Sequence, residues 1–157
     1  MPNLTLRSAH PDEAPLVGNL VVAAFEEFKG KLDPPSGAHL ETPEKIAAKI
    51  TKGGALLAYA DGEIAGCVLY YPEESALYLG RLAVLPAFRQ HGVGRALVQA
   101  VEAHARQTGF DCVTLSVRIA LPQNRVYFEG MGYRWCSDER HPGFSEPTFV
   151  KLEKKLE

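Results

Sequence analysis

Residues 76–119 constrain the fold of this chain more than any other stretch of its sequence. Residues 76–85 (ALYLGRLAVL) and residues 112–119 (CVTLSVRI) both have the aliphatic and β-branched content of a strand. Between them, residues 92–108 repeat apolar side chains at helical spacing, and Gly109 follows where such a helix would end. A strand, a helix and a strand in this order predict a βαβ unit with parallel strands and a right-handed crossover.

The residues before this unit predict antiparallel pairing. Residues 54–60 and 63–71 are two β-rich runs joined across Asp61-Gly62, the strongest short hairpin signal. The other predicted elements are a strand at 4–7, helices at 13–28, 42–51 and 122–131, and closing strands at 133–136 and 149–152. We therefore expect an α/β (α+β) fold in a single domain over residues 1–157, with a mixed central sheet of six to seven strands and helices on both faces.

Composition narrows the class of partner. The 157 residues carry 17 Lys and Arg against 19 Asp and Glu, a net charge of −2, which lacks the basic surplus of a nucleic-acid-binding protein. No apolar run approaches the roughly 18 residues of a membrane span, and the first residues lack the pattern of a signal peptide. We expect a cytoplasmic protein that binds neither nucleic acid nor membrane, and a homodimer is left open.

The three cysteines show no pairing pattern. Cys67, Cys112 and Cys136 lie far apart, without a CxxC pair and without histidines at metal-ligand spacing. We interpret them as buried small hydrophobic residues in a reducing compartment, and we expect no metal site.

The turn between the strand at 76–85 and the following helix has the character of an anion site. Backbone N–H groups from Gln90 to Arg95 would point out of the helix N-terminus, at the positive end of the helix dipole. Gly92 and Gly94 would let a phosphate approach the backbone, and Arg89, His91 and Arg95 would add donors. Neither a GxxxxGK[ST] loop nor a complete GxGxxG is present, so a Walker A site and a dinucleotide site do not fit. A glycine pair that only opens a helix is the alternative.

The segment Arg89-Gln90-His91-Gly92-Val93-Gly94 resembles the [QR]-x-x-G-x-[GA] signature of the GNAT family of N-acetyltransferases. The opening LTLRSAHPDEAPLV is similar to that family's first strand and helix, and LPQNRVYFEGMGY is similar to its short helix near the active site. The resemblance implies a sheet splayed open between the strands at 76–85 and 112–119, with acetyl-CoA bound as co-substrate in the gap.

The resemblance also implies which residues contact acetyl-CoA. The pantetheine arm would pair with the backbone of the strand, the pyrophosphate would lie on the turn, and the short helix would add further contacts. The residues in these three groups are Leu82, Ala83 and Val84; Arg89, Gln90, His91, Gly92, Val93, Gly94, Arg95 and Ala96; and Asn124, Tyr127 and Phe128.

Two departures from the family pattern affect catalysis. Family members often carry a tyrosine, which protonates the departing thiolate, at the position of Phe128. Tyr127 is the candidate here, although one residue is about 100° of helix rotation, and packing aromatics are an equal alternative. The strand at 76–84 has no carboxylate, so no general base is assigned and a water chain or a free neutral amine is expected. Asn124 either bonds the pantetheine or is a polar residue of the first helical turn.

Two functions follow. The first is transfer of an acetyl group from acetyl-CoA to a primary amine of a small molecule or polypeptide; the alternative is a catalytically degenerate module that binds or senses acyl-CoA.

Residues 26–44 hold five acids and two lysines, and the loop at 137–148 is also acidic. In the family's fold these segments would flank the acceptor side and attract a cationic amine, unless both are merely solvated. Arg81 and Arg118 interrupt apolar strands; they are interpreted as strand arginines with satisfied hydrogen bonds, and contact with an anionic part of a substrate is the alternative.

Overall fold

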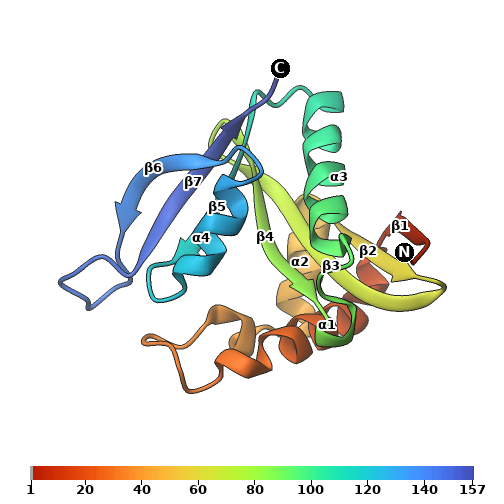
Figure 1. Cartoon of the computed structure of the whole chain (residues 1–157), viewed down its shortest axis with the longest axis horizontal. Helices are drawn as coiled ribbons and strands as arrows, with labels where there is room; N and C mark the ends of the chain where they lie inside the picture. The colour runs from red at the N-terminus through yellow and green to blue at the C-terminus, as the bar shows by residue number, and fades with distance from the viewer. Residues whose placement is uncertain (1) are drawn as a thin grey trace.

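The computed structural model describes residues 2–157 as a seven-stranded mixed sheet with helices on both faces (Figure 1). The strand order is β1-β2-β3-β4-β5-β7-β6. The strands are β1 (Leu4–Ser8), β2 (Gly54–Ala60), β3 (Glu63–Glu73), β4 (Ala76–Val84), β5 (Cys112–Arg118), β6 (Arg134–Glu139) and β7 (Phe149–Lys155). The helices are α1 (Ala14–Phe25), α2 (Pro43–Lys52), α3 (Val93–Gln107) and α4 (Pro122–Glu129). The predicted fold class is confirmed.

The hairpin between β2 and β3 turns at Asp61-Gly62, as the sequence predicts. Both residues have positive φ, 50° for Asp61 and 83° for Gly62, as a two-residue turn matched to the strand twist requires. Strands β1 to β4 then follow one another in antiparallel order.

The sheet opens between β4 and β5. These two strands are parallel but pair only at Leu77 with Val113 and at Tyr78 with Thr114. Beyond Tyr78 they diverge, while β5 pairs with β7 from Cys112 to Arg118. The register between β3 and β4 also shifts next to Arg81, whose φ is +52°. The backbone of β4 therefore bends away from β5.

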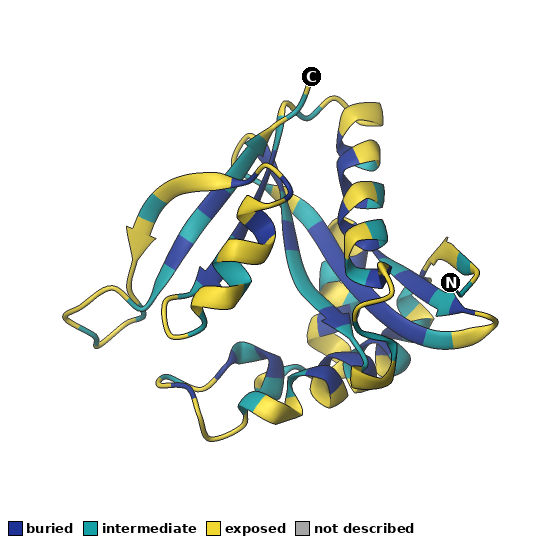
Figure 2. Cartoon of the chain, viewed as in Figure 1, coloured by how far each residue is buried: buried dark blue, intermediate teal, exposed yellow. Residues whose placement is uncertain are grey.

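Two hydrophobic cores lie on opposite faces of the sheet (Figure 2). On one face, α3 buries Leu97, Val98 and Val101 against the sheet. On the other, α1 buries Val17 and Val21 together with α2. Burying an aliphatic side chain of this size contributes about 1.5–3 kcal/mol, so both helices are fixed to the sheet. None of the helices in residues 2–157 has the length and apolar character needed to cross a membrane.

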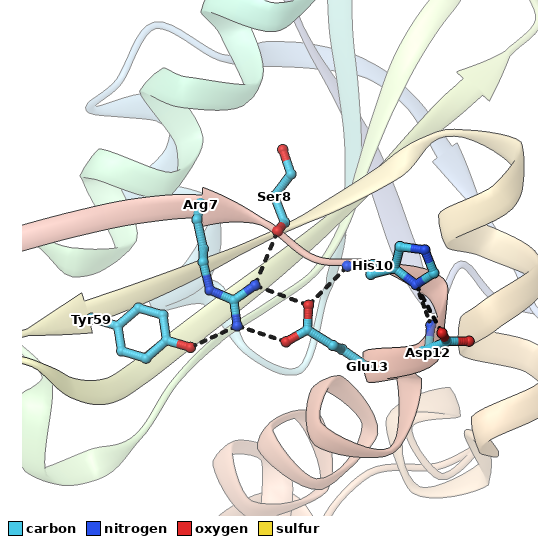
Figure 3. Close-up of polar contacts among 6 residues, drawn as sticks. All are labelled: Arg7, Ser8, His10, Asp12, Glu13 and Tyr59. Carbon is cyan, nitrogen blue, oxygen red and sulfur yellow. Dashed lines mark hydrogen bonds and ion pairs between the residues drawn. The ribbon is translucent and has the colours of Figure 1, made fainter.

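An ion pair between Arg7 and Glu13 joins β1 to the turn before α1 (Figure 3). The Arg7 guanidinium donates to both carboxylate oxygens of Glu13, at 2.9 and 2.6 Å, and to the Tyr59 hydroxyl. The hydrogen bond from Arg7, assisted by the His10 N–H, lowers the pKa of Glu13 to about 2. The helix predicted over residues 13–28 is shorter in the structure, where residues 11–13 and 26–28 form 3₁₀ turns at its two ends.

The cysteines differ in their environments, although all three are free. Cys67 is buried, and burial raises the pKa of its thiol to about 12. Cys112 is half-buried and Cys136 is exposed. The interpretation as buried residues is confirmed for Cys67 and wrong for Cys136, which lies on the edge strand β6.

Candidate functional site

A cavity of about 950 Å³ occupies the opening between β4 and β5. One wall is formed by the first turn of α3 and by α4, and the other by the end of α1 and the segment at 28–37. Because α3 and α1 pack on opposite faces of the sheet, the cavity extends across the sheet between these two walls.

The first turn of α3 presents uncapped backbone donors to this cavity. Gly92 is the N-cap residue with a φ of +81°, and no side chain caps the helix. The first helical bond runs from the Ala96 N–H to the Gly92 carbonyl, so the N–H groups of residues 93–95 have no partner within the helix. A Cβ atom on Gly92 would meet nothing within 4 Å, so the approach to these donors is open. Uncapped donors at a positive dipole end suit a phosphate.

The Arg89 side chain is held by protein groups. Its Nε donates to the Val84 carbonyl at 3.1 Å and its Nη2 to the Ala24 carbonyl at 3.0 Å. Its Nη1 pairs with Glu27 at 2.5 Å. Arg89 thus ties the turn to β4 and α1, which fixes the position of the backbone N–H groups after it.

Most of the residues that the sequence predicts for the cofactor line this one cavity, and two do not. Leu82, Ala83 and Val84 line it from β4, residues 89, 90 and 92–95 from the turn, and Asn124, Tyr127 and Phe128 from α4. Ala96 is absent from the lining, and His91 lines a separate, smaller hollow beside Asp61 and Phe88. Of the three basic side chains expected around the phosphate, Arg95 therefore remains on the wall without a carboxylate partner within residues 2–157.

Tyr127 and Phe128 face different surroundings. Phe128 is 8% exposed and packs edge-on against Tyr133, with the ring centroids 5.9 Å apart. The Tyr127 side chain is 43% exposed, and its hydroxyl lies 2.6 Å from the position that a Cβ would take on Gly94. Glycine at position 94 is therefore needed for Tyr127 to reach the first turn of α3. Burial raises the pKa of Tyr127, so its hydroxyl keeps its proton at neutral pH.

The splayed edge of β4 carries free backbone groups inside the sheet. The N–H of Leu85 bonds to Ala65 in the segment that pairs with β4. Because successive N–H groups of a strand alternate between its two edges, the N–H of Val84 faces the opening toward β5. The ladder between β4 and β5 within residues 2–157 ends at Tyr78, so the following stretch of β4 offers an edge to a ligand that carries amides.

The other half of the cavity has an aromatic wall that sequence reasoning missed. Tyr71 on β3 and Tyr78 on β4 are cross-strand partners whose ring centroids lie 5.3 Å apart. His141 and Phe149 reach the same cavity from the far side of β5. The register of the β3–β4 hairpin could have placed the two tyrosines together, but no local pattern places residues 141 and 149 there.

The predicted acidic rim is not found on the cavity wall. Of the acids at 26–44 and 137–148, only Glu27 lines the cavity, and it is paired with Arg89. The side chain of Glu41 is buried, with its Oε2 accepting from Lys49 at 2.5 Å and Arg81 at 2.7 Å. Burial would raise the pKa of Glu41, but the hydrogen bonds from Lys49 and Arg81 outweigh it and leave that pKa lowered. The described part of the cavity wall therefore carries no unpaired acid from these two segments, while exposed Asp33 lies close enough to Arg118 to affect its pKa. Attraction of a cationic amine by these segments stays a prediction.

Arg118 is bonded to carbonyl groups, as expected of a satisfied strand arginine. Its Nη1 donates to the Pro34 carbonyl at 2.7 Å and its Nη2 to the Pro35 carbonyl at 3.1 Å. These bonds join the end of β5 to the segment that covers the cavity.

The comparison with protein families identifies the class of protein. The model of the acetyltransferase (GNAT) family matches residues 21–133, and the chain belongs to this family. Over 92 residues, 57% of this chain, it is 35% identical to a protein of Danio rerio named "Probable N-acetyltransferase 14". The match spans only 32% of that relative's length.

Solved structures share the whole fold at low sequence identity. Ard1 from Thermoplasma volcanium superposes with a TM-score of 0.78 at 16% identity, covering 98% of this chain and 97% of that one. The PaiA N-acetyltransferase from Thermoplasma acidophilum, solved in complex with coenzyme A, gives 0.77 at 17% identity, covering 98% and 99%. The ribosomal-protein-S18-alanine N-acetyltransferase from Escherichia coli gives 0.77 at 15% identity, covering 98% and 94%. At these identities the likeness concerns the fold.

Proposed function

We propose that this protein transfers the acetyl group of acetyl-CoA to a primary amine. The observation that carries the proposal is the junction of two features in one cavity: the uncapped first turn of α3 and the free edge of β4 that leads to it. The turn suits a pyrophosphate and the strand edge suits an arm with two amides. A continuous stretch of chain from Leu82 to Arg95 thus matches both ends of coenzyme A.

The cavity residues support direct attack by the amine. Acetyl-CoA would supply a thioester, whose carbonyl carbon forms the new C–N bond and whose C–S bond then breaks. The N–H of Val84, directed into the opening, would donate to the oxyanion that develops on that carbon. The departing thiolate is a good leaving group and gains a proton from water or from the protonated Tyr127 hydroxyl on this wall, so transfer does not depend on Tyr127 alone.

The amine must lose a proton, and His141 is the wall residue suited to accept it. Burial and the nearby Arg118 charge lower the pKa of His141, so its ring is neutral at pH 7. Its Nδ1 lies 2.5 Å from the Thr148 hydroxyl, which fixes the ring. Burial, with Tyr78 adding, raises the pKa of Tyr71 to about 12, so that phenol keeps its proton.

The test combines binding with turnover. Calorimetric titration with acetyl-CoA and with ADP separates a coenzyme A site from a general phosphate site, because only acetyl-CoA can use the β4 edge. We expect acetyl-CoA to bind at least about tenfold more tightly, which corresponds to about 1.4 kcal/mol. Release of free thiol on adding a panel of primary amines then measures transfer. Tight binding without thiol release from any amine would favour the degenerate binding module, and equal affinity for ADP would contradict the proposal.

A further inference from the structure

Charge on the acceptor half of the cavity is positive and in excess. The charged side chains on the whole wall are four arginines, Arg81, Arg89, Arg95 and Arg118, and one acid, Glu27. Glu27 pairs with Arg89, and Glu41 pairs with both Arg81 and Lys49. Among the ion pairs of residues 2–157, none includes Arg95 or Arg118. Arg95 lies on the turn proposed for the pyrophosphate, so Arg118 is the arginine of the acceptor half that has no carboxylate partner within residues 2–157.

Arg118 can donate further hydrogen bonds to an anion in the cavity. The Pro34 and Pro35 carbonyls accept one hydrogen bond from each terminal nitrogen, which fixes the plane of the guanidinium but adds no negative charge. A guanidinium has five N–H donors, so three remain for another partner. Burial and the neighbouring Arg81 lower the pKa of Arg118, while exposed Asp33 offsets this in part. A half-buried cation beside a second cation is stabilised by a bound anion.

The surroundings of Arg118 restrict the size and shape of that anion. The same cavity is lined by the aromatic rings of Tyr71, Tyr78, His141 and Phe149. Ser116, two residues before Arg118 on β5, also lines it. A cavity that presents these rings together with a fixed cation favours a small molecule with an apolar body and one anionic group. Arginine binds a carboxylate in a two-pronged geometry that matches its fork.

We infer that the acceptor is a small amine that also carries a carboxylate, and that Arg118 binds this carboxylate. The inference rests on the proposed function, since the amine would be acetylated at the same site. In this arrangement the carboxylate contacts Arg118, the apolar body lies against the tyrosine pair, and the amine points toward the β4 edge. An acidic guiding surface is not needed, because the amine reacts in its neutral form.

The test separates recognition of the carboxylate from transfer. With coenzyme A present at saturation, 3-phenylpropanoate and 3-phenylpropanamide are titrated calorimetrically; they differ only in the charged group. We expect the carboxylate to bind at least about tenfold more tightly to the wild type, in line with about 1.5–3 kcal/mol for a hydrogen bond to a charged group. Arg118→Gln should remove this preference, and Arg118→Lys should keep part of it because the charge remains. Arg125→Gln, on the exposed face of α4 and paired with Glu129, is the matched control and should change nothing.

Turnover provides the second arm. Phenylalanine should have a kcat/KM at least about tenfold above that of phenethylamine, and Arg118→Gln should bring the two within about twofold while the affinity for acetyl-CoA is unchanged. Equal binding of the carboxylate and the amide by the wild type, or binding of neither, would overturn the inference. So would an equal loss for both amines in Arg118→Gln, which would indicate a structural role only. Failure of the proposed function has a different signature, namely no tight binding of acetyl-CoA.

Discussion

Glu41 pairs with two cations, Lys49 and Arg81, and replacing it should lower the free energy of unfolding. Its side chain is 2% exposed, and those of its partners Lys49 and Arg81 are 27% and 28% exposed. Breaking a fully buried pair typically destabilises by about 3–5 kcal/mol, but water can reach both partners here, so we expect about 2–3 kcal/mol for Glu41→Ala. For a chain of this length, 1 kcal/mol lowers Tm by roughly 2–4 °C. The Tm at pH 7 should therefore fall by about 4–12 °C.

Differential scanning calorimetry with a matched variant checks this magnitude. Glu129→Ala removes an exposed pair with Arg125 four residues earlier on α4, worth about 0.3–0.5 kcal/mol, and should lower Tm by no more than about 2 °C. Because the folded-state pKa of Glu41 is lowered, the stability it confers is present above its ordinary pKa of 4.5 and is lost as pH falls through the folded value. The difference between wild type and Glu41→Ala should thus shrink below pH 4.5. A loss no larger than that of Glu129→Ala, or a difference independent of pH, would refute the reasoning.

Three further predictions concern single side chains. Tyr127→Phe should lower kcat by less than about 100-fold, because the hydroxyl lies beside the first turn of α3; a larger loss at unchanged affinity for acetyl-CoA would make it an essential acid. The pKa of His141 is lowered, so kcat/KM of the wild type should fall below pH 6.5, where the ring gains a proton. His141→Gln should lower kcat and abolish this fall. An unchanged pH profile would rule out His141 as the proton acceptor. Since the pKa of Glu13 is about 2, the Tm advantage of the wild type over Glu13→Gln should persist below pH 4.5 and vanish only near pH 2 in thermal melts.

Local signals in the sequence predicted the elements on which the cofactor half of the site is built. Asp61-Gly62 marked the hairpin, and Gly92 and Gly109 marked the two ends of α3, because each has a positive φ that glycine, or an aspartate at the turn, adopts readily. Spacing along one strand–turn–helix segment also sufficed to bring Val84, Gly92 and Gly94 onto one cavity wall.

The acceptor half depends on contacts that no local pattern encodes. Arg118 meets Pro34 and Pro35 across more than eighty residues of chain, with sequence separations of 84 and 83. The composition of residues 26–44 predicts surface acids, whereas Glu41 turns inward to Arg81 and Glu27 turns to Arg89. Net charge of a segment describes its composition, and the direction of each side chain depends on tertiary packing.

The central claim is that the first turn of α3 binds the pyrophosphate of acetyl-CoA, and one pair of variants tests it most directly. Gly92 and Gly109 lie at opposite ends of α3 with φ of +81° and +88°, and a Cβ on either would meet nothing within 4 Å. Alanine at either position carries the same strain of about 1–2 kcal/mol in the left-handed region. Relief of that strain at position 92 would rotate the uncapped N–H groups that follow, whereas position 109 is remote from the cavity.

Calorimetric titration of acetyl-CoA into both folded variants is the decisive measurement. Losing one hydrogen bond to a charged group weakens binding by about 1.5–3 kcal/mol. We therefore predict that Gly92→Ala raises the Kd at least about tenfold and that Gly109→Ala leaves it within about twofold of the wild type. An unchanged Kd in Gly92→Ala, or an equal rise in both variants, would contradict the assignment of this turn as the coenzyme A site.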